Sequence, residues 1–453
     1  MFKKRSVYRS ERRSSSGVSA AALLVFLGAV AAGVWFLMRD LSGPSVTMDP
    51  PHSGRMGIAQ SVRLSMDDKS GVQSVAVTVR RGAQSMIVLK EKYAELEKHR
   101  EAVFSLKDTQ LPEGSFELEI KAQDGSFAGF GFGNSTTLRL PVILDAQPPR
   151  IAVKTMPPSI RRGGAALIVY TVSEDVDRTG VRLGQSFFHA FRQPNGSYAC
   201  LFPFPITYKT SEFFPEVLAR DLAGNVTSSR LPVRAVNRTF RSDTLKIPES
   251  FLNFKAAELA QICPEKSTSL EQYLCANSKE RAIDDAKLIE IGSDPARTSP
   301  SFLWTGRFLQ LPKSAVKARY GDFRSYVDDN RQKIDEQTHM GLDLASVARA
   351  EVPAAQHGRV IWTGYLGIHG NMVLVDHGMG LATQYSHLSE YSVQVGDEVQ
   401  PGQIIGRTGT TGLAGGDHLH FGVLIGGIPV EPLEWLDPKW LKNNITDRLN
   451  TPL

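Results

Sequence analysis

The sequence predicts a mainly β chain of several domains that follows one apolar segment near the N-terminus. Three observations carry this prediction. Residues 17–38 contain no charge, two central segments share strand patterning and an internal repeat, and a glycine-rich C-terminal region holds seven of the ten histidines, from His339 to His420. At 453 residues, the chain is long enough for about two to four domains, each with its own core.

The excess positive charge is confined to the N-terminus. The first 13 residues contain six lysines and arginines and one acidic residue, Glu11, and this net of +5 equals the net charge of the whole chain. The remainder is therefore neutral overall. Because this remainder has no net positive charge to bind the phosphates of a nucleic acid, nucleic acid is excluded as a partner.

The uncharged segment 17–38 is long enough to cross a bilayer, since 22 helical residues rise roughly 33 Å against a hydrocarbon core of about 30 Å. Basic residues on its N-terminal side predict a cytoplasmic tail at 1–16 and a single-pass anchor in the inner membrane, with the rest of the chain in the periplasm. A cleavable signal peptide is the alternative, because Ala29–Ala31 is a small-x-small site. The apolar run continues through Trp35–Leu37, which favours a retained anchor.

Residues 45–147 and 148–242 have the short alternating strands and Gly, Asn and Asp turns of β-sandwiches. Gly133–Val142 and Gly224–Val233 match at seven of ten positions, 91 residues apart. We therefore predict two tandem immunoglobulin-like domains, which could dock a periplasmic protein partner. Within the first, Leu89–Phe104 is rich in helix formers, so either a helical insertion or a charged hairpin fits it.

Residues 243–300 predict a mainly helical connector, because they are rich in Ala, Glu, Lys and Leu. Two of its residues, Cys263 and Cys275, could form a disulfide in an oxidising compartment, and the remaining cysteine, Cys200, is interpreted as a buried small hydrophobe. The last folded region is 301–442, followed by a short tail at 443–453.

Three short motifs in the C-terminal region suggest a zinc site: His339–Asp343, Tyr385–Ser389 and Asp417–His420. Imidazole and carboxylate are zinc ligands, and a site with three protein ligands leaves its fourth position open. If each motif is extended, period-two alternation places His339 and Asp343 on one face of a strand, and His418 and His420 on one face of another.

With these motifs, the region of about 302–440 resembles the lysostaphin-type (LytM-like) zinc endopeptidases, which cut peptide cross-links in bacterial cell walls. The resemblance lies in a series of short matches: Tyr320–Arg324, His339–Ala345, Gly358–Val360, Gly370–Val373, Asp376–Gly378, Tyr385–Leu388, Val395–Val399, Gly402–Gly406, Gly409–Gly412 and His418–Phe421. It implies an antiparallel β peptidase domain.

The resemblance also implies the role of each site residue. His339, Asp343 and His420 would bind one Zn²⁺ per chain, while His387 and His418 would move protons and stabilise the developing oxyanion. The expected activity is hydrolysis of peptidoglycan stem-peptide cross-links by a zinc-activated water, with the two histidines assisting.

The alternative is a non-catalytic scaffold that binds wall material or activates a partner hydrolase. The complete set of five site residues argues against this alternative. His357, His369 and His377 lie beside glycines, and we expect them to have structural or solvent-facing roles.

Overall fold

The computed structural model describes residues 16–38, 40–126 and 132–450. The chain divides into two compact units, one of residues 1–147 with 222–225 and one of 148–221 with 226–453, and each is described by itself. The charges of the predicted cytoplasmic tail lie in residues 1–15, outside the described residues.

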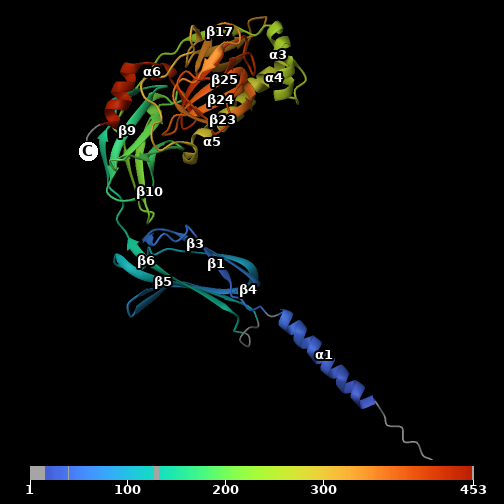
Figure 1. The fold of residues 1–453 in the computed structure, drawn as a ribbon. Helices are drawn as coiled ribbons and strands as arrows, with labels where there is room; N and C mark the ends of the chain where they lie inside the picture. The colour runs from blue at the N-terminus through green and yellow to red at the C-terminus, as the bar shows by residue number, and fades with distance from the viewer. Residues whose placement is uncertain (1–15, 39, 127–131, 451–453) are drawn as a thin grey trace, which may run out of the picture. The chain divides into compact units, whose positions relative to one another are not determined.

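The first unit begins with helix α1 (Ser16–Met38), which covers the predicted anchor segment (Figure 1). Among the residues that the structure describes, no helix is both long enough and apolar enough to cross a membrane.

The rest of the first unit is a six-stranded sheet in the order β1-β3-β5-β6-β2, with β4 paired to β3. Its strands are β1 (Ser45–Asp49), β2 (Arg55–Gly57), β3 (Val62–Arg81), β4 (Gln84–Phe104), β5 (Gly114–Asp124) and β6 (Ser135–Asp145). Leu89–Phe104 is therefore no helix; it lies within the single strand β4, which forms one arm of a hairpin with β3. Pairing with the neighbouring strand β3 overrides local helix propensity, and the charged side chains remain in solvent.

The second unit opens with a β-sandwich of two four-stranded sheets, ordered β11-β10-β14-β15 and β12-β13-β9-β7. Tyr170, Val181, Leu201 and Val217 are buried in its core. The strands are β7 (Ile151–Thr155), β8 (Ser159–Arg161), β9 (Ala165–Val172), β10 (Val176–Leu183), β11 (Ser186–His189), β12 (Phe191–Arg192), β13 (Tyr198–Pro203), β14 (Glu216–Asp221) and β15 (Val226–Arg230), with η1 at Thr210–Glu212.

The internal repeat corresponds to the same structural piece in both β segments. In each copy, the repeated residues form the second strand of an antiparallel hairpin, β5–β6 in the first and β14–β15 in the second. The third cysteine, Cys200, is fully buried in the sandwich core, as expected.

The connector begins with a strand and continues as helices. Strand β17 (Ser242–Lys246) pairs in parallel with β19 (Phe323–Val327), which pairs with β20 (Lys333–Thr338) to form a three-stranded sheet. A disulfide joins Cys263 at the end of α3 to Cys275 at the end of α4. Strand β16 (Arg234–Val236) precedes the connector, whose elements are β17 (Ser242–Lys246), α3 (Glu249–Ile262), α4 (Ser269–Cys275), the π-helical turn η2 (Ala276–Glu280), α5 (Arg281–Gly292) and η3 (Pro295–Arg297).

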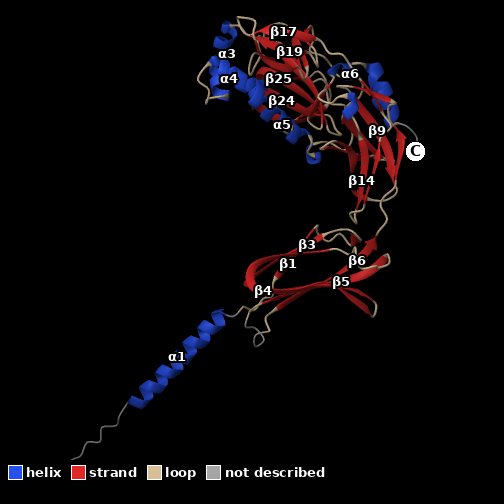
Figure 2. Ribbon diagram, turned by 180° about the vertical axis from the view of Figure 1, so that it is seen from behind, coloured by secondary structure: helices blue, strands red, loops and turns tan. Residues whose placement is uncertain are grey.

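The C-terminal domain is built on a ten-stranded sheet with the path β18-β21-β28-β25-β24-β23-β26, with β22, β27 and β29 off this path. Figures 1 and 2 show helices α3, α4 and α5 beside this sheet from opposite sides. The elements are β18 (Ala315–Ala318), β19 (Phe323–Val327), β20 (Lys333–Thr338), β21 (Leu342–Ala345), β22 (Glu351–Pro353), β23 (Gly358–Leu366), η4 (Gly367–His369), β24 (Gly370–Asp376), β25 (Leu381–Tyr391), β26 (Glu398–Val399), β27 (Ile404–Thr408), β28 (Leu419–Ile425), β29 (Ile428–Val430), α6 (Pro432–Leu436), α7 (Pro438–Leu441), η5 (Lys442–Thr446) and α8 (Asp447–Leu449).

Candidate metal centre and active site

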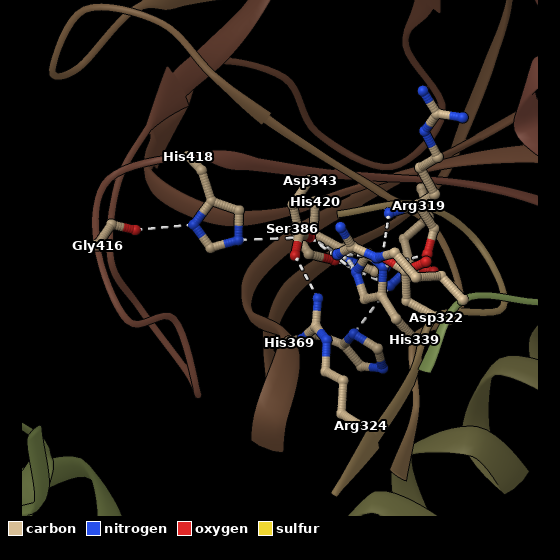
Figure 3. Close-up of polar contacts among 12 residues, drawn as sticks. Arg319, Asp322, Arg324, His339, Asp343, His369, Ser386, Gly416, His418 and His420 are labelled. Atoms are coloured by element: carbon tan, nitrogen blue, oxygen red, sulfur yellow. Dashed lines mark hydrogen bonds and ion pairs between the residues drawn. The ribbon is translucent and has the colours of Figure 1, made fainter. Parts of the chain in front are cut away.

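Three predicted ligands meet where β21, β28 and β25 lie side by side in the central sheet. The strand register places His420 opposite Asp343 on one side and Ser386 on the other. His339 Nε2 lies 2.8 Å from Asp343 Oδ1 and 3.0 Å from His420 Nδ1, and the last two atoms are 3.0 Å apart (Figure 3). All three side chains are buried.

These three atoms fit a zinc ion. Ligand atoms at about 2.0–2.2 Å from a tetrahedral zinc lie roughly 3.3–3.5 Å apart, so each atom of the triad would shift outward by about 0.3 Å. Small side-chain rotations can supply a shift of this size. Two imidazoles and one carboxylate are also a zinc donor set.

Neighbouring groups orient the first two ligands. His339 Nδ1–H donates to the carbonyl of Arg319 at 3.0 Å, which leaves the lone pair of Nε2 directed at the triad. Asp343 places Oδ1 in the triad, while its Oδ2 accepts a hydrogen bond from Arg324 Nη2 at 3.1 Å. The carboxylate of the buried Asp322 accepts from the backbone N–H of Arg319 at 2.9 Å and so supports the same turn.

The expectation that His339 and Asp343 share one strand is wrong. Strand β20 ends at Thr338 and β21 begins at Leu342, so the chain bends between the two ligands. A Cβ on Gly341 would lie 2.7 Å from both His420 Nε2 and the carbonyl oxygen of Phe421. The bend therefore requires glycine at this position, where the backbone approaches the third ligand.

His387 lies on β25, one residue after the position that pairs with His420. Its backbone has a φ of 62°, in the left-handed region that a side chain rarely adopts. Its Nδ1–H donates to the Thr411 carbonyl at 2.8 Å, which leaves the lone pair on Nε2. The imidazole is 4.9 Å from that of His418 between ring centroids.

His418 is held in a similar way, since its Nδ1–H donates to the Gly416 carbonyl at 2.8 Å (Figure 3). Its Nε2 lies 3.5 Å from Asp343 Oδ1. The backbone of His418 forms an isolated bridge with Gly409 just before β28 begins. Both predicted proton-transfer histidines thus have Nδ1 tied to a backbone carbonyl, and both line the same cavity as the triad.

The local environment shifts the pKa values of His387 and His418 in opposite directions. Burial, together with the nearby imidazoles of His418 and His420, holds the pKa of His387 well below its ordinary value. Burial also acts on His418, but hydrogen bonding to Asp343 and the charge of that carboxylate outweigh it and raise the His418 pKa. Burial lowers the pKa of His420 to about 4, so it is neutral near pH 7, as a metal ligand must be.

Asp343 is ionised in this setting. Burial alone would raise its pKa, but its interactions with the imidazoles of His339, His418 and His420 hold it well below its usual range. Arg324 remains charged, because the attraction of Asp343 outweighs the effect of burial and raises the arginine pKa.

The site opens into a cavity of about 490 Å³, and the connector forms part of its wall. The connector contributes both apolar and polar side chains to the lining of this cavity. They include Ile247, Phe251, Tyr273, Asn277, Arg281 and Leu288. An excised C-terminal domain would lack this wall.

His369, which was expected to have a structural or solvent-facing role, is buried beside the predicted site residues. His369 lines the cavity, 6.2 Å from His420 between ring centroids, and is only 8% exposed. Gln384 contacts its Nδ1 at 2.9 Å, and its buried Nε2 has no hydrogen-bond partner among the described residues. By contrast, His377 is a buried structural residue, bonded to the His357 carbonyl and to the Thr383 hydroxyl.

Comparison with known proteins places this site in a family. Residues 337–432 match the sequence model of peptidase family M23. The C-terminal domain is a peptidase family M23 domain. This is a family of zinc metallopeptidases, and the matched segment of the M23 domain includes all five predicted site residues.

Curated relatives of the M23 domain are named for peptidoglycan cleavage or related activities. The DD-carboxypeptidase/endopeptidase Mpg of Neisseria meningitidis serogroup B is 39% identical over 95 residues, which cover 21% of this chain and 22% of Mpg. The peptidoglycan DD-endopeptidase ShyA of Vibrio cholerae is 36% identical over 96 residues, or 21% of this chain and 22% of ShyA. Lysostaphin of Staphylococcus staphylolyticus is 40% identical over 87 residues, or 18% of each chain. The chain thus spans about a fifth of the length of these relatives.

Among solved structures, the catalytic domain of lysostaphin from Staphylococcus simulans aligns with a TM-score of 0.24 and 28% identity. The alignment covers 28% of this chain and 94% of that domain.

Proposed function

We propose that the chain is a zinc endopeptidase that hydrolyses peptide cross-links of bacterial peptidoglycan. The observation that carries the proposal is the convergence of His339, Asp343 and His420 in one cavity with His387 and His418. The M23 match and the names of the relatives support peptidoglycan as the substrate class.

In the proposed mechanism, His339 Nε2, Asp343 Oδ1 and His420 Nδ1 hold one zinc ion. When bound, zinc supplies Lewis-acid activation of water and of a peptide carbonyl. His387 keeps its proton on Nδ1 against the Thr411 carbonyl, so its Nε2 can accept a proton from the reacting groups. His418, whose pKa is raised by Asp343, can hold a proton on Nε2 and donate a hydrogen bond to a developing oxyanion.

The test is digestion of isolated peptidoglycan by the purified full chain, with and without a chelator, and identification of the products by mass spectrometry. His418→Ala is the control variant. We expect chelator-sensitive loss of cross-linked peptides that the control does not produce. Intact cross-links after treatment with folded, zinc-loaded protein would contradict the proposal and favour the scaffold alternative.

We further propose that residues 17–38 anchor the chain in the inner membrane as a single pass, with both β segments and the M23 domain in the periplasm. The basic residues before the uncharged segment support this orientation. We also propose that the two β segments are immunoglobulin-like domains that dock a periplasmic protein partner. Membrane fractionation of cells, together with mass measurement of the mature N-terminus, tests the anchor. Release of a protein cut after Ala31 would show a signal peptide instead.

A further inference from the structure

Helix α3 of the connector contains a buried lysine that reaches the active-site side of the M23 domain. Lys255 is 1% exposed, and its ammonium group donates to Glu258 at 2.6 Å and to the backbone carbonyl of Thr410. A charge buried to this degree is costly unless it is paired and hydrogen-bonded. The Thr410 carbonyl is therefore part of what holds Lys255 in place, and Lys255 in turn fixes that carbonyl.

The partner of Lys255 binds the same loop two residues later. Glu258 Oε2 pairs with Lys255, while its Oε1 accepts a hydrogen bond from the backbone N–H of Gly412 at 3.0 Å. One ion pair on α3 thus binds the peptide groups on both sides of Thr411.

Thr411 links these two hydrogen bonds from α3 to His387, the proposed proton-transfer histidine. Its carbonyl accepts the Nδ1–H of His387 at 2.8 Å. Its hydroxyl donates to the Leu388 carbonyl at 2.9 Å and accepts from the backbone N–H of Asn371 at 2.9 Å. His387 has a left-handed backbone conformation, which persists only where surrounding contacts hold the residue, and the hydrogen bond to Thr411 is one of these contacts.

We propose that Lys255 and Glu258 are positioning residues that orient His387 by fixing Thr410–Gly412. The connector is then part of the working enzyme, although it lies outside the segment that matches the family. This inference rests on the proposed function, because it assigns His387 its catalytic task.

The first experiment compares Lys255→Met with Lys287→Met in the full chain. Lys287 pairs with Glu290 on the exposed side of α5 at 2.8 Å, with the same i, i+3 spacing, and so provides a matched control. We expect Lys255→Met to lower kcat about 10- to 100-fold with little change in KM and with wild-type zinc content, since small misplacements of a reacting group cost this much. Lys287→Met should match wild type. A wild-type kcat for Lys255→Met would overturn the inference.

The second experiment separates positioning from general destabilisation. In a His387→Ala background, Lys255→Met should cause little further loss of kcat, because the residue on which it acts is gone. An equal loss in both backgrounds would show that Lys255 does not act through His387. Should Lys255→Met fail to fold, Glu258→Gln, which keeps the acceptor for the Gly412 N–H, should retain more activity than Glu258→Ala, and equal activities would contradict the inference.

A measurement that needs no activity distinguishes this inference from the proposed function. In metal-free protein, amide hydrogen exchange at Gly412 should be faster in Glu258→Ala than in wild type and unchanged in Lys287→Met. If the wild-type chain does not cleave peptidoglycan, the proposed function fails, while the exchange result still shows whether α3 holds the loop. Unchanged exchange in Glu258→Ala would overturn the positioning role even in an active enzyme.

Discussion

The ligand assignment predicts a zinc-dependent gain in stability that His420→Ala removes. The three ligand atoms already lie 2.8–3.0 Å apart, so metal binding needs only about 0.3 Å of outward movement by each and little reorganisation. At a free zinc concentration of 100 times Kd, binding to the folded state adds about 2.7 kcal/mol to the free energy of unfolding. For the second unit, which has about 300 residues, that corresponds to a rise in Tm of roughly 4 °C.

The assay is thermal unfolding of chelator-treated protein with and without added zinc. His420→Ala removes one of three ligands and should abolish the rise. His357→Asn is the matched control, because His357 lies outside the triad and bonds to the Leu303 carbonyl; this variant should keep the full rise. An undiminished zinc response in His420→Ala would refute the assignment, and loss of the response in His357→Asn would show that the effect is not specific to the triad.

Three further predictions concern the same unit. His387→Ala and His418→Ala should each lower the rate of cross-link cleavage about 10²- to 10⁴-fold while retaining the zinc-induced rise in Tm, and loss of that rise would indicate a ligand role instead. Burial lowers the pKa of His377 to about 4. Its contribution of about 3 kcal/mol is therefore present above pH 6.5 and lost as the pH falls to 4, so His377→Gln should flatten the pH dependence of the unfolding free energy in that window. Reduction of the Cys263–Cys275 disulfide should cost about 3 kcal/mol, measured by denaturant unfolding, and an unchanged midpoint would contradict this.

Part of the site could be predicted because its ligand-type residues lie within short sequence motifs. His339–Asp343 and Asp417–His420 each place ligand-type side chains within a few residues, and glycines between the motifs signal the turns that bring strands together. The detailed path was less predictable. An extended His339–Asp343 was expected, but close approach of His420 at Gly341 bends the chain there, and that contact joins residues about 80 positions apart.

The fold shows the same division. Alternating strands and the repeat predicted two β segments, and composition predicted the connector helices. In Leu89–Phe104, local composition left helix and hairpin equally open, and only pairing with β3 decided between them. That pairing joins β4 to the preceding strand, residues 62–81, across the two-residue turn Gly82–Ala83.

The contacts that hold the site in place could not be predicted from the sequence, and the reason is physical. Lys255 and Thr410 are 155 positions apart, and one member of the pair is a backbone carbonyl, which carries no residue-type signal. In the sequence, Lys255 resembles any solvent-exposed lysine on a helix, and only the structure shows that its side chain is buried and hydrogen-bonded. The same holds for Arg324, whose partner Asp343 is 19 positions away across a bend. Metal ligands can be predicted from their residue types, whereas the groups that orient them are identified only by their proximity in the folded chain. An M23 domain cut at its family boundary would therefore retain its ligands and lose the α3 contacts around Thr411, which is why the experiments above use the full chain.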